Sequence, residues 1–172
     1  MSAQDEDERQ SSKSEATETT SASAETANKP FYEYWNDRDF VRWMGARITH
    51  SADGVATAYL EPGEHHRGAG AGGQAVTGAV QAYIFDIVTG AAVASLAHGL
   101  RPQVTVALDV TFEYPAYDAP LTFEARVQGG GKQVVFVEGE CRDVNGRVCS
   151  RVRAIYRRFE KRLEAPPTIE AK

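Results

Sequence analysis

The stretch from Gly78 to Ala97 constrains the fold most, because its twenty residues carry a single charged side chain, Asp86. A segment that is apolar on every face is typical of a helix that is buried on most sides. Its length would also allow a membrane span. Asp86, Gln81 and Gly90 interrupt it, however, and a charge near the middle of a span is costly. The sequence therefore predicts a core helix over residues 78–97 and no association with a membrane.

The rest of the chain is rich in alternating, β-branched segments that could cover such a helix. Residues 31–43 are aromatic and predict a helical lead-in, and residues 61–76 predict an irregular loop. Strands are expected at 47–50 and 55–60 around a turn at Ser51–Gly54, and then at 103–114, 121–128, 133–142 and 147–159. Short connections favour antiparallel neighbours. The prediction is an α+β fold, in which one curved antiparallel sheet wraps around the helix.

Charge is concentrated at the N-terminus. Residues 1–28 hold seven acids and two bases, which account for the whole net charge of −5, and contain no Val, Ile, Leu, Phe, Tyr or Trp. Such a composition predicts a disordered acidic tail. We expect one domain over 29–161 and a flexible tail over 162–172. The charge balance of the domain argues against a nucleic-acid partner, and the absence of a signal-peptide pattern predicts a cytoplasmic protein.

Two cysteines, Cys141 and Cys149, flank a turn that contains Asn145 and Gly146. A two-residue turn would place the cysteines on opposite faces of the hairpin, whereas a type I turn with a bulge at Gly146 would make them face each other. The sequence leaves both registers open. Without a secretion signal, reduced thiols are expected.

Two patterns that suggest cofactors are set aside. Gly68, Gly70 and Gly73 spell G-x-G-x-x-G, but a dinucleotide site needs a βαβ unit, and only antiparallel strands are predicted after the helix. The loop is either a flexible approach to a ligand or a plain surface loop. His65 and His66 are adjacent, and no other ligands lie at metal-site spacing. We therefore expect neither a metal nor a resident cofactor.

Asp86 is the leading candidate for chemistry, because a carboxylate within an apolar helix is costly unless it is paired or neutralised. Burial would make it a plausible general base. The alternative is a structural aspartate that bonds Thr89 or a nearby backbone group. At the start of the helix, Thr77 is a suitable N-cap. The first-turn N–H group of Gly78 could then receive a developing oxyanion, aided by the helix dipole.

The spacing of these two candidates has a consequence for assembly. Gly78 and Asp86 are eight residues apart, or roughly 12 Å along one helix. They are too far apart to act on one carbon atom within a single chain. If both are catalytic, Gly78 of one subunit must face Asp86 of another, which predicts a two-fold homodimer or a homotetramer built from such pairs.

With this layout, residues 37–159 resemble the hotdog-fold acyl-CoA thioesterases of the PaaI-like group. The resemblance rests on TGAVQAYIFD (77–86), similar to the family pattern H-G-G-x6-[DE], on VTVALDVTFEYPA (104–116), on GGGKQVVFVEGECRDVNGRVCSRV (129–152) and on the lead-in from Phe40 to Tyr59. It implies hydrolysis of an acyl-CoA thioester at a subunit interface, with coenzyme A as part of the substrate. Asp86 would activate water or act as nucleophile, the Gly78 N–H would bind the thioester oxygen, and the Thr105 hydroxyl would help to hold water or substrate.

The chain also departs from that family. Thr77 stands where the family usually has His, and Ala79 replaces the second Gly. Gln74 is the one nearby side chain that could replace a polar residue of the preceding loop. Lys132 and Arg67 are expected to contact coenzyme A phosphates or to be plain surface charges. These changes keep a second function open, that of a non-catalytic acyl-CoA or acyl-ligand binding protein. A hydratase or dehydratase of the same fold is a third and less favoured function, because such chemistry calls for an Asp and a His together, and His98 lies about 12 residues, or roughly 18 Å along a helix, from Asp86.

Overall fold

The computed structural model describes residues 31–68, 73–96, 101–117 and 119–160. The predicted tails at 1–28 and 162–172 lie outside these residues, as do His98 and the last residue of the predicted helix. The described elements, in chain order, are α2 (Phe31–Asn36), α3 (Asp39–Met44), β1 (Ala46–Ala52), β2 (Val55–Leu60), η1 (Glu64–His66), α4 (Gly78–Ala94), β3 (Gln103–Phe112), β4 (Leu121–Gly130), β5 (Val134–Arg142) and β6 (Val148–Arg158).

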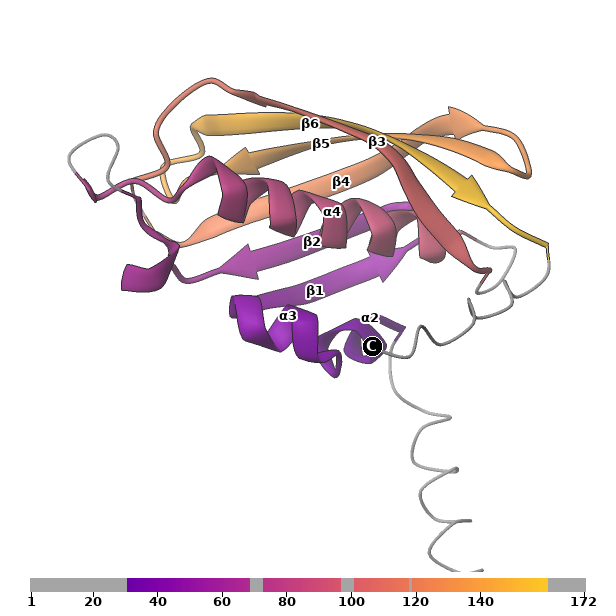
Figure 1. The fold of residues 1–172 in the computed structure, drawn as a ribbon, viewed down its shortest axis with the longest axis horizontal. Helices are drawn as coiled ribbons and strands as arrows, with labels where there is room; N and C mark the ends of the chain where they lie inside the picture. The colour runs from indigo at the N-terminus through magenta and orange to yellow at the C-terminus, as the bar shows by residue number, and fades with distance from the viewer. Residues whose placement is uncertain (1–30, 69–72, 97–100, 118, 161–172) are drawn as a thin grey trace, which may run out of the picture. The chain divides into compact units, whose positions relative to one another are not determined.

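The predicted α+β arrangement is confirmed. The described strands form a six-stranded antiparallel sheet in the order β1-β2-β4-β5-β6-β3, and α4 runs along its concave side (Figure 1). The core lies between them. Ile84, Phe85 and Val88 of α4 are fully buried, and the Phe85 ring meets the Phe123 ring of β4 edge to face, with 5.2 Å between centroids.

The prediction that β3 and β4 are neighbours was wrong. β3 pairs with β6 at one edge of the sheet, while β4 pairs with β2 and β5. The link between them, residues 113–120, contains Pro115 and Pro120 and is too long for a tight hairpin turn. It carries the chain past the start of α4, where the buried Ala116 accepts a hydrogen bond from the Val76 N–H at 2.9 Å. β3 is thereby left as an open edge.

The predicted first hairpin is confirmed, with β2 as predicted and β1 longer than predicted. Its turn is Asp53–Gly54, where φ is 50° and 79°, as expected for a two-residue turn of type I′. The expected turn residue Ser51 belongs to β1 instead. Its buried hydroxyl donates to the Ala91 carbonyl at 3.0 Å. This bond ties the hairpin to α4.

The predicted helical lead-in is present and consists of two short helices, α2 and α3. The backbone adopts an extended conformation at Arg38, where φ is −80° and ψ is 134°. Just before this break, the Asn36 amide makes two 2.8 Å bonds, donating to the Ile48 carbonyl and accepting from the Ile48 N–H. An asparagine side chain that bonds backbone groups in this way competes with helix continuation. The break places Trp35 and Phe40 beside α4.

The cysteine hairpin combines the two predicted registers. Asp143–Gly146 form a turn closed by the Gly146 N–H to the Asp143 carbonyl at 2.9 Å, with φ of 79° at Gly146. Arg142 faces Val148, and a register shift then places Cys141 opposite Ser150. Both cysteines are buried and form no disulfide with each other, and burial raises the pKa of the Cys141 thiol.

Candidate active site

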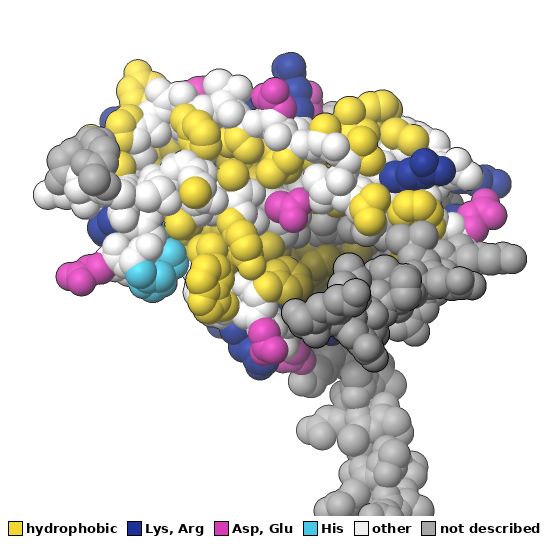
Figure 2. All heavy atoms as spheres, viewed as in Figure 1, with side chains coloured by type: hydrophobic (Ala, Val, Ile, Leu, Met, Phe, Trp, Pro, Cys, Tyr) yellow, Lys and Arg dark blue, Asp and Glu magenta, His cyan; other side chains and the backbone are white. Residues whose placement is uncertain are grey.

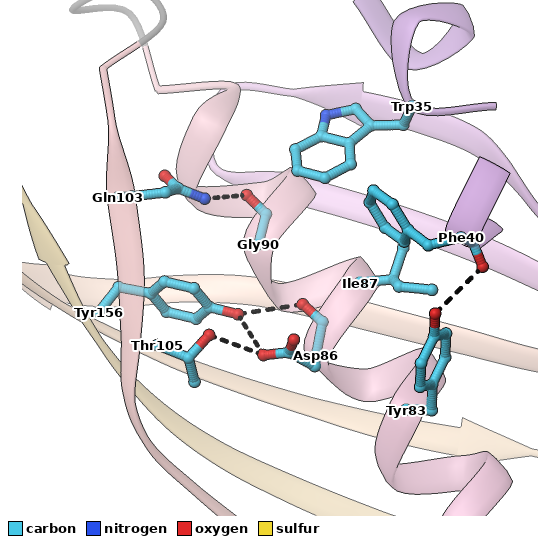
Figure 3. Close-up of a pocket in the computed structure, with 9 residues that line it drawn as sticks. All are labelled: Trp35, Phe40, Tyr83, Asp86, Ile87, Gly90, Gln103, Thr105 and Tyr156. Atoms are coloured by element: carbon cyan, nitrogen blue, oxygen red, sulfur yellow. Dashed lines mark hydrogen bonds between the residues drawn. The ribbon is translucent and has the colours of Figure 1, made fainter. Parts of the chain in front are cut away.

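The Asp86 side chain extends from α4 toward β3, where two hydroxyl groups meet its carboxylate (Figure 3). The Thr105 hydroxyl donates to Asp86 Oδ1 at 2.7 Å. The Tyr156 hydroxyl lies 3.0 Å from the Asp86 carbonyl oxygen and 3.3 Å from Oδ1. Hydrogen bonds to a carboxylate fix its orientation. The carboxylate is thus held in one position by β3 and β6.

The pairing of β3 with β6 is what brings these hydroxyls together. Thr105 and Tyr156 are direct cross-strand partners, and a register shift follows between Thr105 and Ala107. A bulge of this kind changes the direction of side chains along a strand. Because β3 lies over α4 at the sheet edge, the paired side chains point at the helix and meet Asp86.

Asp86 is not buried within one subunit, which corrects the expectation from the sequence. Its side chain is exposed, as are the neighbouring helix residue Ala79 and, partly, Ala82 and Tyr83. These positions form one stripe on an otherwise buried helix. The Thr89 hydroxyl bonds the backbone carbonyls of Phe85 at 2.6 Å and Asp86 at 3.3 Å, and not the Asp86 carboxylate.

Tyr156 is the buried member of this group. Its hydroxyl also lies 2.8 Å from the Thr89 hydroxyl. Burial raises the pKa of Tyr156 to about 12, and the negative charge of Asp86 adds to this rise. The phenol therefore stays protonated at neutral pH and serves as a hydrogen-bond donor to Asp86.

A cavity of about 230 Å³ opens beside Asp86. Its wall is mainly apolar and aromatic, with a polar end at Asp86, Thr105 and Tyr156. The lining residues are Trp35, Phe40, Tyr83, Asp86, Ile87, Gly90, Gln103, Thr105 and Tyr156. An apolar pocket with a few convergent polar groups is typical of a small-molecule site.

The start of α4 has the predicted cap and two unused donors. Thr77 is the N-cap, and its hydroxyl accepts from the Val80 N–H at 3.3 Å. Among the residues that the structure describes, none accepts a hydrogen bond from the N–H of Gly78 or Ala79. A methyl group on Gly78 would lie 2.9 Å from the Phe112 ring. Within one chain, the space that the absent side chain of Gly78 leaves is therefore taken by the Phe112 ring.

The other predicted binding residues do not line the cavity beside Asp86. Gln74 is exposed before α4, and its carbonyl accepts from the Arg67 guanidinium. Lys132 is exposed in the turn between β4 and β5. Gly78, Thr77 and Ala79 lie two turns away along the helix. One chain therefore does not bring the two halves of the predicted site together.

The histidine pair has a structural explanation. His66 is buried, its Nδ1 accepts from the Gly63 N–H and its Nε2 donates to the Met44 carbonyl, each at 2.9 Å. Burial and the adjacent His65 lower the pKa of His66, in keeping with a neutral ring. Within the described ranges no three His, Cys, Asp or Glu side chains gather as a metal site would require. The G-x-G-x-x-G stretch falls largely on residues 69–72, outside those ranges.

Sequence reasoning missed Tyr156, Gln103 and Trp35. The alternation of β3 places Gln103 and Thr105 on one face, which was a usable signal for Gln103. Tyr156 required the β3–β6 pairing, and Trp35 required the helix break at Arg38. Neither of these follows from local pattern.

We expect Thr105→Val to lower kcat about 10- to 100-fold, because hydrogen bonds to charged groups contribute roughly 1.5–3 kcal/mol. Valine keeps the shape and strand preference of threonine but removes the donor to Asp86. KM and the melting temperature should stay unchanged, since Thr105 is exposed on an edge strand. Steady-state kinetics and thermal melting check this, and an unchanged kcat would show that the Thr105 hydroxyl has no part in turnover.

Residues 73–150 match the model of the thioesterase superfamily. The resemblance to hotdog-fold thioesterases is confirmed. The matched hotdog segment includes both α4 and β3. No curated protein matches the chain in sequence at a significant level.

Solved structures share the hotdog fold over most of the described chain. A conserved protein of Pseudomonas aeruginosa is 22% identical, with 73% of this chain and 98% of that chain covered and a TM-score of 0.67. The Escherichia coli PaaI protein of the phenylacetic acid degradation operon is 18% identical, with coverage of 74% and 88% and a TM-score of 0.66. A hypothetical thioesterase of Streptococcus pneumoniae, solved with coenzyme A, is 15% identical, with coverage of 69% and 88% and a TM-score of 0.61.

Proposed function

We propose that this protein hydrolyses acyl-CoA thioesters. The observation that supports it best is the Asp86 carboxylate, oriented by Thr105 and Tyr156 at the mouth of an apolar cavity. Asp86 would take a proton from a water molecule whose oxygen attacks the thioester carbonyl; direct attack by the carboxylate is the other route. The carbon–sulfur bond then breaks, and the coenzyme A thiolate takes up the proton.

The carbonyl oxygen becomes an oxyanion during attack, and the N–H of Gly78 would bind it. This donor has no partner among the described residues and lies at the positive end of the α4 dipole. Within one chain it is about 12 Å from Asp86. The proposed site therefore uses Gly78 of one subunit and Asp86 of a second, with Thr77, Ala79 and Gln74 beside the thioester.

Exposed apolar surface supports a homodimer. Hydrophobic side chains gather on the face that carries α4 and β3 (Figure 2). The edge strand β3 exposes Val104, Val106 and Phe112, with Val106 61% exposed. Patches and open edges of this kind mark interaction surfaces. The exposed side chains of β3 lie beside the exposed stripe of α4 that contains Asp86.

We expect the protein to sediment as a dimer or a tetramer at micromolar concentration. Burial of the β3 edge and the α4 stripe stabilises the assembly, and a single subunit holds only half of each site. Sedimentation velocity over a concentration series checks this. A stable monomer that retains full activity would contradict the shared site.

Coenzyme A is the proposed leaving group, in keeping with the coenzyme A in the structure of the Streptococcus pneumoniae relative. Arg67 and Lys132 would contact its phosphates. No helix among the residues described is long and apolar enough to cross a membrane. We propose a cytoplasmic enzyme without a resident cofactor.

One observation favours a second function, the binding of an acyl-CoA or other acyl ligand without turnover. The Phe112 ring lies against Gly78 and restricts access to the Gly78 N–H within one chain. Position 77, where the family usually has histidine, is a threonine whose hydroxyl caps the helix. The hydratase alternative depends on His98, outside the described residues.

A panel of acyl-CoA thioesters with free-thiol detection tests the proposal. Release of coenzyme A from at least one acyl class, well above the rate without enzyme, is expected. Binding by calorimetry without thiol release across the panel would instead support the acyl-binding function.

A further inference from the structure

We propose that Gly90 and Trp35 limit the length of the acyl group, so that the protein selects apolar acyl groups of up to about eight non-hydrogen atoms. The inference rests on the proposed function, because it assigns the cavity beside Asp86 to the acyl part of the thioester. Gly90 lies one helical turn after Asp86 and therefore on the same face of α4. Both residues line the cavity.

Packing and backbone geometry do not explain why position 90 is glycine. Gly90 is buried within α4, one turn before the helix ends at Ala94, and its φ is not positive. Glycine in a helix interior is unfavourable relative to alanine. A methyl group there would lie 3.5 Å from the Tyr156 hydroxyl, 3.6 Å from Gln103 Nε2 and 3.9 Å from Trp35 Cη2. These are ordinary contacts, so alanine would fit, and the effect of glycine is to leave that space empty.

Trp35 closes the cavity at this end (Figure 3). Its ring meets Phe40 edge to face, with 6.3 Å between centroids. Its Nε1 is buried and has no hydrogen-bond partner among the residues that the structure describes. The indole is therefore held by packing, and its size, not a hydrogen bond, defines the end wall. Gln103 is fixed beside it by donating to the Gly90 carbonyl at 2.7 Å.

The dimensions of the cavity set the class of acyl group. A volume of about 230 Å³ holds roughly eight groups of the size of a water molecule. Phe40, Tyr83 and Ile87 make the wall apolar, which suits a hydrocarbon chain or an aryl ring and disfavours a charged terminus. With the thioester at Asp86, the far end of such a group would reach Gly90 and Trp35.

The test measures kcat/KM for straight-chain acyl-CoA substrates from two to twelve carbons, with benzoyl-CoA and phenylacetyl-CoA included. For Gly90→Ala we expect about a 10-fold loss on the longest substrates that the wild type accepts, and little change on acetyl-CoA. Its melting temperature should be equal or higher. For Trp35→Phe, which removes Cη2 and breaks no hydrogen bond, we expect the preferred length to increase by one or two carbons.

Tyr59→Phe is the matched control, since this aromatic residue is 42% exposed on β2 and does not line the cavity. Its length profile should equal that of the wild type. Opposite shifts for the two cavity variants support the inference; unchanged profiles, or equal losses on every substrate, overturn it. If the wild type releases no thiol, the proposed function fails, and calorimetric affinities for the same series then decide the length limit separately.

Discussion

Asp86→Asn is expected to lower kcat/KM for thioester hydrolysis by about 10²–10⁴-fold, the usual contribution of a general base. Asparagine has the same shape, and its amide oxygen can still accept the hydrogen bond from Thr105. It cannot accept a proton from water. The fold should tolerate the change, because the Asp86 side chain is exposed in the single chain. Free-thiol release and thermal melting measure the two effects.

Asp109→Asn is the matched control. Asp109 is an exposed aspartate on the same strand as Thr105, its cross-strand partner is Arg153, and it does not line the cavity beside Asp86. Loss of this charge should leave kcat/KM within about two-fold of the wild-type value, because exposed surface charges away from the cavity contribute little. Unchanged turnover in Asp86→Asn would remove the carboxylate from the mechanism and with it the thioesterase proposal.

Gly78→Pro is expected to lower kcat by about 10²–10³-fold, as the loss of one oxyanion donor does in other enzymes. Proline lacks the N–H group but suits the first position of a helix. The preceding Thr77 already has the extended backbone that proline requires, with ψ of 149°. The substitution therefore removes the donor with little cost to the helix.

The Phe112 ring needs a separate control, because a carbon attached at Gly78 would lie 2.9 Å from it. Phe112→Leu alone should keep most activity, and Gly78→Pro is then compared in that background. Near-normal kcat in the double variant would exclude the Gly78 N–H as the oxyanion donor. The Ala79 N–H would then be the candidate donor.

Mixing the two inactive proteins tests whether the sites are shared. In a mixed dimer, one site would carry both changes and the other neither. Random exchange of subunits should then restore about one quarter of the wild-type activity. If each subunit held a complete site, no activity would return. Exchange is followed by mass spectrometry, so that a failure to mix is recognised.

Much of the site was predictable from local sequence. The isolated charge of Asp86, the cap at Thr77 and the glycine that follows it are features of one helix and need no tertiary information. Alternation also located β3 and therefore Thr105. These signals are strong because helical and strand periods act over a few residues.

The rest depended on contacts between distant segments. Strand pairing is decided by the whole sheet, so β3 pairs with β6 and not with its neighbour in sequence. Only that pairing sets Tyr156 opposite Thr105. The wall at Trp35 likewise depends on Asn36, which bonds Ile48 and ends the first helix.

The sequence by itself determined that one apolar helix with a single carboxylate would be the centre of the fold. Burying so much apolar surface requires a sheet around it. Tertiary structure decided that the carboxylate is exposed along a stripe of α4, beside an open strand edge and a cavity closed by Trp35. The burial of an apolar helix follows from its composition. The face of that helix that the sheet leaves exposed to solvent depends instead on which strands pair.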